Sequence, residues 1–249
     1  MNIQNRSLSH RRRILGDTYN DLIMGLPGVI AYWPQDETSG AVARCLTDPA
    51  MNGAYTGVTL ANDNTGPFGT PAPFYDGTND FCAIYTAALN AAFNGVTGTA
   101  IIWAKVANAG VWTDAAGRYA LRLYDDGNNR YEFWKSSTNN AVTLLGNAGA
   151  GTASISKTSF SDTGWFTLAA TWSDSNNADE FIAYVNAIAI AAPSPNLNAW
   201  GGAGLAGNAT LIGAKINTPT SPWHGWLGPA IIADQVWPLA TIQRASLVA

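Results

Sequence analysis

Residues 118–135 read RYALRLYDDGNNRYEFWK, and this stretch decides the class of fold. Every second residue from Tyr119 to Leu123 is large and apolar, which is typical of a strand that buries one face. Residues 125–129 are Asp, Gly and Asn, which favour tight turns, and a second β-rich run follows at 130–135. The pattern predicts two strands joined by a short turn.

Comparable β-rich runs recur along the chain from residue 29, separated by Gly, Asn, Pro, Asp and Ser. These further runs are Val29–Trp33, Asp80–Tyr85, Ala100–Val106, Phe166–Trp172, Phe181–Val185, Ile188–Ala191, Ala209–Ile212 and Trp226–Ala233. Near the end only Leu239–Leu247 has helical character, and no internal repeat of about 20–50 residues is present. Many short strands with turn signals between them predict an all-β sandwich or barrel.

The composition is poor in charge, because charged residues make up 12% of the 249, about half of the ~25% that is usual. Such a surface suits contact with other subunits or with glycans. Residues 1–26 hold four arginines against two aspartates, so of the net charge of −4 the remainder of the chain carries −6. An acidic body argues against nucleic acid as a partner. No apolar run approaches the ~18 residues of a membrane span, so no membrane partner is expected.

Residues 1–26 are predicted to form a basic N-terminal arm ahead of a domain at 27–249. Ser9 can cap a short amphipathic helix that runs to about Met24, where Gly25 ends it. This helix either packs on its own sandwich or docks on a neighbouring subunit. The candidate assembly residues of the arm are Arg11, Arg12, Arg13, Ile14, Leu15, Leu22 and Ile23.

Seven segments from residue 30 onward carry a resemblance to a known family. They are IAYWPQDETSG at 30–40, NGAYTG at 52–57, FYDGTNDF at 74–81, GWFTLAATW at 164–172, YVNA at 184–187, GWLG at 225–228 and WPL at 237–239. In this collinear order the chain resembles laminin-G-like, concanavalin A-like domains. The resemblance implies an antiparallel β-sandwich of the jelly-roll type, in which Val29–Trp33 and Trp226–Ala233 share a sheet.

Two positions depart from the family pattern. Ala187 stands where the family hairpin has glycine, and because alanine resists positive φ we expect a longer or differently shaped loop there. The related pentraxins bind calcium through an Asp-Asn pair and a late acidic loop, but residues 213–217 (GAKIN) contain no carboxylate. We therefore expect no cofactor. Asp76 and Asp80, the weak candidates for calcium ligands, are expected to cap turns instead.

The segment before the first strand carries a finer resemblance. Residues 19–23 (YNDLI), followed by Pro27 and a Tyr-Trp strand, resemble the entry to laminin-G-like modules of tailed-phage virion proteins. This implies a non-catalytic virion surface protein, a capsid decoration or tail-associated subunit, with other virion proteins or copies of itself as partners and cell-surface glycan as a further ligand. The arginines near the N-terminus precede no apolar run, so we expect no signal peptide and synthesis in the host cytoplasm. The alternative is a carbohydrate-binding module of a non-viral assembly or enzyme system.

Catalysis is not expected, because the Glu-x-Asp-x-x-Glu pattern of glycosidases with this fold is absent and His10 and His224 are the only histidines. Cys45 and Cys82 are interpreted as buried thiols, with a disulfide as the alternative. Four tryptophans in or near predicted loops are candidates either for stacking on glycans or for interface or local packing. These four are Trp112, Trp134, Trp200 and Trp223.

Overall fold

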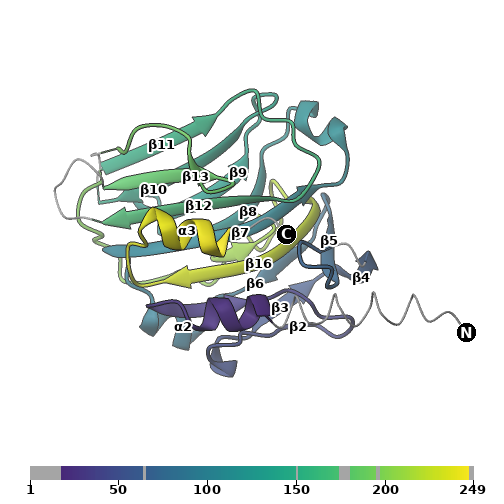
Figure 1. Cartoon of the computed structure of the whole chain (residues 1–249), viewed down its shortest axis with the longest axis horizontal. Coiled ribbons are helices and arrows are strands. Elements are labelled where there is room, and N and C mark those ends of the chain that lie inside the picture. Colours follow the sequence, from purple (N-terminus) through teal and green to yellow (C-terminus); the bar gives the residue numbers. More distant parts are fainter. Residues whose placement is uncertain (1–17, 64–65, 150, 174–179, 195–196, 247–249) are drawn as a thin grey trace, which may run out of the picture.

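The chain folds into two antiparallel sheets that pack face to face (Figure 1). The structure is a computed structural model, and it describes residues 18–63, 66–149, 151–173, 180–194 and 197–246. Side chains from both sheets meet between them, where Tyr131 of one sheet stacks on Trp172 of the other with ring centroids 4.0 Å apart. The prediction of an all-β antiparallel sandwich of the jelly-roll type is confirmed.

The first sheet has eight strands within the described part of the chain, in the order β14-β13-β12-β7-β16-β5-β4, with β1 also paired to β16. The strands are β1 (Val29–Trp33), β4 (Thr59–Asp63), β5 (Ala72–Asp76), β7 (Thr97–Val106), β12 (Phe166–Ser173), β13 (Phe181–Val185), β14 (Ile188–Ala189) and β16 (His224–Ala233). Since β1 pairs antiparallel with β16, the first and late strands share a sheet as predicted.

The second sheet also has eight described strands, in the order β11-β10-β9-β8-β15-β6-β3-β2. They are β2 (Val42–Ala43), β3 (Gly53–Thr56), β6 (Phe81–Ala83), β8 (Arg118–Asp126), β9 (Asn129–Lys135), β10 (Val142–Ala148), β11 (Gly151–Lys157) and β15 (Leu211–Ile212). The helical elements are residues 18–24, α2 (Ala87–Ala92), α3 (Leu239–Ala245) and 3-10 turns at Pro49–Met51 and Ala109–Thr113. None of the helices in the described ranges has the length and apolar character needed to cross a bilayer.

Helix 18–24 and α3 cover the outer face of the first sheet; α3 lies over β7, β12 and β16 (Figure 1). Tyr19 joins the two helices to the sheet, because its buried hydroxyl donates to the main-chain oxygen of Ala245 at 2.7 Å and accepts from Trp103 Nε1 at 3.0 Å. Ile23 is fully buried and Leu22 is partly buried in the same cluster.

Of the two alternatives for this helix, packing on its own sandwich describes residues 18–24: Ile23 is fully buried there and Leu22 is partly buried, so Ile23 is not free to dock on a neighbouring subunit. The physical reason is that the outer face of the first sheet carries large apolar side chains such as Trp103 and Ile231, which need a cover of their own. The other candidate residues of the arm lie outside the described residues. They are Arg11, Arg12, Arg13, Ile14 and Leu15.

The hairpin between β13 and β14 differs from the prediction of a longer loop. Asn186 and Ala187 alone connect the strands, with φ of 51° and 56°, so this is a two-residue turn with positive φ at both positions. Asn186 is held by Thr167 of β12: the Asn186 amide donates to the Thr167 oxygen at 3.0 Å, and Asn186 Oδ1 accepts from the Thr167 amide at 2.9 Å. These two hydrogen bonds offset the cost of about 1–2 kcal/mol that alanine pays in the left-handed region.

The two cysteines are free and buried, as interpreted from the sequence. Cys45 Sγ lies 3.1 Å from the Thr47 hydroxyl oxygen. Cys82 lies on β6 between the sheets, where burial raises the pKa of its thiol. Both side chains thus act as small core residues.

Candidate functional site

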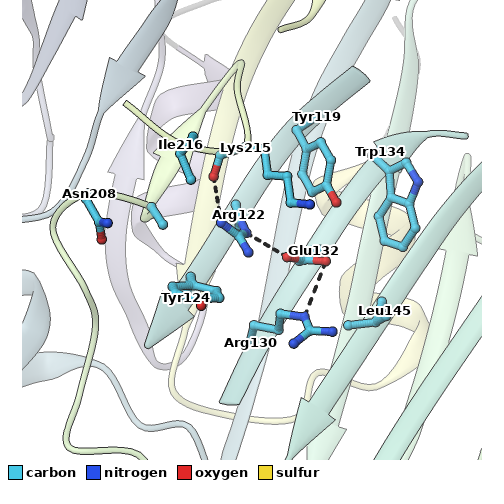
Figure 2. A pocket seen from close by; sticks show the side chains of 11 residues that line it. Tyr119, Arg122, Tyr124, Arg130, Glu132, Trp134, Leu145, Asn208, Lys215 and Ile216 are labelled. Atoms are coloured by element: carbon cyan, nitrogen blue, oxygen red, sulfur yellow. Dashed lines mark hydrogen bonds and ion pairs between the residues drawn. The ribbon is translucent and has the colours of Figure 1, made fainter. Parts of the chain in front are cut away.

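A hollow of about 500 Å³ lies on the outer face of the second sheet, over β8, β9 and β10 and beside the loop that follows β15 (Figure 2). The opposite faces of the same strands carry core residues such as Leu121 and Phe133, so the hollow faces away from the core. Aromatic and cationic side chains dominate its walls. These are Tyr119, Tyr124, Trp134, Arg122, Arg130 and Lys215.

A β-bulge in β8 builds this wall. Tyr119 pairs with Trp134 while Leu121 pairs with Phe133, so the extra residue Ala120 has no cross-strand partner. In an uninterrupted strand, residues three apart point to opposite faces. The inserted residue lets Tyr119 and Arg122 both line the hollow. The sequence-based prediction that Tyr119 shares a face with Leu121 is therefore wrong.

Two aromatic rings stand side by side at one end of the hollow. Tyr119 and Trp134 lie directly opposite each other on neighbouring strands, and their rings stack with centroids 5.5 Å apart and an interplanar angle of 12°. Trp134 is half-buried, so part of its ring meets solvent. At the other end the Arg122 guanidinium lies 3.9 Å from the centroid of the Tyr124 ring, a cation–π contact.

A short ion-pair network crosses the floor of the hollow, and Figure 2 shows Glu132 between two arginines. Arg122 Nε lies 2.6 Å from Glu132 Oε1, and Arg130 Nε lies 3.5 Å from Glu132 Oε2. Burial, followed by the nearby Glu132 carboxylate, raises the pKa of Tyr119 to about 12, so its hydroxyl keeps its proton at neutral pH.

The geometry of the hollow offers little for hydrolysis of a glycosidic bond. That chemistry uses two carboxylates about 5–9.5 Å apart. Glu132 is the single carboxylate in the lining, and it is 4% exposed and engaged by two arginines. What the hollow can do chemically is present ring faces, hydrogen-bond donors and positive charge to a bound molecule.

Asp76 and Asp80 cap the turn after β5, as expected from the sequence. Asp76 Oδ1 accepts from the Thr78 amide at 2.7 Å, and Asp80 Oδ2 accepts from the Asp76 amide at 2.8 Å. Within the described residues, no group of three or more His, Cys, Asp or Glu side chains is arranged to hold a metal ion.

Of the four candidate tryptophans, Trp134 alone lines the hollow. Trp112 and Trp223 take the alternative of local packing and are not available for stacking on a glycan, since they are 1% and 0% exposed and donate from Nε1 to main-chain oxygens of Asp162 and Lys105. Sequence position alone could not decide between the two alternatives, because a loop segment can still insert its side chain between the sheets. Trp200 is half-buried and stacks on Tyr131 with centroids 5.4 Å apart.

Sequence reasoning missed the other residues that line the hollow. The signal was present in β9, where Arg130, Glu132 and Trp134 stand at alternate positions and so share one face. In a chain with so few charges, charged and aromatic residues in alternation on a surface strand indicate a binding face. No local pattern could have found Lys215, which lies 93 residues from Arg122, its hydrogen-bond partner.

Comparison with known proteins identifies the architecture. Neither a protein-family model nor a curated protein sequence matches this chain. Among solved structures, domain 4 of the GH43 arabinanase AbnA from Geobacillus stearothermophilus, in complex with arabinotriose, has a TM-score of 0.59 and 12% identity. The match covers 88% of this chain and 98% of that domain.

Two larger proteins contain a similar part. Trypanosoma rangeli sialidase in complex with sialic acid matches with a TM-score of 0.66 and 9% identity, over 98% of this chain and 39% of the sialidase chain. The receptor-binding domain of botulinum neurotoxin mosaic serotype C/D matches with a TM-score of 0.61 and 11% identity, over 88% of this chain and 50% of that chain. The present chain thus spans half or less of either protein. At these identities the shared feature is the β-sandwich fold.

Proposed function

We propose that this chain is a non-catalytic, glycan-binding β-sandwich, and that the hollow over β8–β10 is its binding site. The observation that carries the proposal is the stacked pair of Tyr119 and Trp134 at one end of a hollow rich in hydrogen-bond donors. The apolar face of a sugar ring packs against aromatic rings, while its hydroxyls take hydrogen bonds from side chains such as Arg130 and Lys215. An amphipathic ligand of this kind fits such a wall.

The comparisons support the proposal at the level of the scaffold. The arabinanase domain was solved with arabinotriose and the sialidase with sialic acid, so sandwiches of this shape occur in proteins that bind sugars. The identities of 12% and 9% carry no residue-level correspondence.

The test is a glycan array probed with the full chain, followed by calorimetric titration of the sugars that bind. Trp134→Ala should weaken binding by about tenfold or more, because it removes the more exposed ring of the pair: Trp134 is half-buried, whereas Tyr119 is 8% exposed. Trp226→Ala is the matched control: Trp226 is also half-buried, but it lies on β16 of the first sheet. An array without a single bound sugar, or equal losses in the two variants, would overturn the proposal.

A second candidate function is that of a virion surface subunit, a capsid decoration or tail-associated protein of a tailed phage. The resemblance of residues 19–23 and the strand that follows supports it, and the structure builds this entry segment into the sandwich through Tyr19. The two functions are compatible, because a glycan-binding face on a virion would contact the host surface. The test is mass spectrometry of purified particles of a tailed phage whose genome encodes this chain. Absence of the chain from intact particles rejects the virion role.

A further inference from the structure

We infer that the sugar bound in the hollow carries an acidic group, a carboxylate or a sulfate, and that Lys215 together with Arg130 binds it. This inference rests on the proposed glycan-binding function and names the class of ligand. It follows from the charge of the hollow and from which of its charges are already engaged inside the protein.

The hollow is positive on a negative chain. Three of the nine Lys and Arg side chains of residues 18–246 line it, whereas Glu132 is the single carboxylate in the lining. Three positive charges less one negative charge leave a formal charge of +2, in a chain whose net charge is −4. Grouping of scarce cations at one concave place favours an anionic ligand there.

Arg122 is engaged by the protein and serves as an anchor. It is 5% exposed, it donates to Glu132 through Nε at 2.6 Å, and its Nη1 donates to the main-chain oxygen of Lys215 at 2.6 Å. Its flat face lies on the Tyr124 ring. Arg122 therefore neutralises Glu132 and holds the loop after β15, so it has little left to offer a ligand.

Lys215 keeps its charge for a ligand. The residue is exposed, and in the described ranges it forms no salt bridge; its ammonium group lies 5.9 Å from the centroid of the Tyr119 ring. Arg130 is also partly available, since its side chain is 22% exposed and its contact with Glu132 is longer than that of Arg122. Its Nη1 donates to the main-chain oxygen of Gly127, so the remaining guanidinium N–H groups are the ones that can reach a ligand. A guanidinium and an ammonium on one wall provide the charge-assisted donors that carboxylates and sulfates accept.

The positions of these groups match one ligand that has both a ring and an acid. Figure 2 shows Lys215 and Trp134 on opposite sides of Tyr119. A sugar ring packed against the aromatic pair would therefore have an ammonium group within reach of its substituents. A neutral sugar would leave Lys215 without a partner, and an anion without a ring would make no use of the aromatic wall.

The experiment uses the full chain and pairs of probes that differ only in their acidic group. The pairs are sialyllactose with its methyl ester, oligogalacturonate with its methyl ester, and dextran sulfate with dextran. A single-stranded oligonucleotide serves as a competing polyanion that lacks pyranose rings. The first two pairs report on carboxylates and the third on sulfate, so the pairs separate the two sources of negative charge.

The expected result is that at least one acidic probe binds about tenfold more tightly than its neutral partner. This preference should fall to within about threefold in Lys215→Gln and in Arg130→Gln, and it should weaken as NaCl rises through the physiological range. The matched control is Arg244→Gln, which removes one positive charge from an exposed position on α3, above the other sheet.

The outcomes distinguish this inference from the proposed function. If neutral sugars bind as tightly as acidic ones and Trp134→Ala abolishes both, the glycan site stands and the acidic ligand is wrong. If acidic probes are preferred but Lys215→Gln and Arg130→Gln bind like Arg244→Gln, the acid is bound elsewhere and the inference also fails. Tighter binding of the oligonucleotide than of every acidic sugar overturns it as well. Absence of binding to every probe rejects both the site and its ligand.

Discussion

The Nη1 of Arg122 donates a 2.6 Å hydrogen bond to the main-chain oxygen of Lys215, and this bond ties the middle of β8 to the loop after β15. The same guanidinium pairs with Glu132, so one buried side chain satisfies a carboxylate and positions a loop. The loop then holds the exposed ammonium group of Lys215 at the rim of the hollow. If the hollow binds a glycan as proposed, stability and recognition are coupled at a single residue.

Replacement of Arg122 should be costly. Arg122→Leu leaves Glu132 buried without its closest partner, and we expect a loss of about 3–5 kcal/mol in the free energy of unfolding. Urea denaturation measures this loss. The control is Arg244→Leu, at an exposed position of α3, which should change the free energy of unfolding by close to zero. The double variant Arg122→Leu/Glu132→Leu should recover most of the loss, since both charges are then gone. A single variant as stable as the control would contradict the assigned role.

The Tyr19 hydroxyl is predicted to contribute to the attachment of the N-terminal helix. Tyr19→Phe leaves Trp103 Nε1 and the Ala245 oxygen without this partner in a buried place, which should cost about 1–3 kcal/mol. Differential scanning calorimetry should show a lower Tm. Tyr85→Phe, at a tyrosine that is 37% exposed, removes a hydroxyl at the surface and should change the Tm little. Equal shifts in the two variants would mean that the hydroxyl of Tyr19 does not hold the helix.

Asp114 is predicted to contribute to unfolding at acid pH. Burial would raise the pKa of Asp114, but hydrogen bonds from Lys135, the Ala116 amide and Arg118 outweigh it and lower the pKa below its ordinary 3.8. A lowered pKa in the folded state stabilises the protein above pH 3.8, and this contribution disappears as the pH falls through the folded pKa. Asp114→Asn should therefore flatten the loss of stability below about pH 4.

Asp80 provides the control, because its pKa is shifted in the opposite direction to that of Asp114. Burial raises the pKa of Asp80, so its protonation favours the folded state as the pH falls, and Asp80→Asn should make the loss of stability in acid steeper. Urea midpoints at a series of pH values measure both effects. The assignment is wrong if Asp114→Asn and Asp80→Asn change the slope in the same direction.

Glycine at position 187, in the turn between β13 and β14, should make the protein more stable. Ala187 has a φ of 56°, and Ala187→Gly relieves the strain of the left-handed region, which should raise the free energy of unfolding by up to about 1 kcal/mol after the entropy of the unfolded glycine is included. Ala115, with a φ of 54°, should respond in the same direction. Ala189→Gly, in the extended strand β14, should destabilise the protein instead. A loss of stability in Ala187→Gly would show that the turn is not strained.

The architecture could be predicted from the sequence because the strands that form the sandwich alternate in hydrophobicity, and because the family segments occur in order. Six strands were missing from the prediction: β2, β3, β4, β5, β10 and β11. Strands β10 and β11 were missed because residues 142–157 are rich in Gly, Ala, Asn and Ser, which are poor strand formers. The structure gives the reason for one of them: a Cβ added to Gly146 would lie 2.7 Å from the Phe181 ring of the facing sheet. Position 146 thus requires glycine because of a contact with the other sheet, and the local sequence pattern does not show such contacts.

The candidate site was less predictable than the fold. The bulge at Ala120 changes neither the composition nor the length of the strand in an evident way, yet it turns Tyr119 from the core face to the outer face. Trp134 was one of four candidates chosen because aromatic rings in or near loops can stack on sugars, and the structure places it inside β9. Arg122 and Lys215 acquire their roles only from a contact between segments that are far apart in the sequence.

The position of β16 in the first sheet has a consequence for synthesis. β16 is the last strand in the described part of the chain, yet it pairs with β7 along one edge and with both β5 and β1 along the other. β1 has no other strand partner among the described residues. A ribosome must therefore deliver about two hundred residues after β1 before that strand finds its place. Until then the nascent chain carries open strand edges that could pair with other chains. Because the sheet closes on β16, the sandwich can be completed only after this strand has been synthesised, and a premature stop before residue 224 should yield an aggregating product rather than a smaller domain.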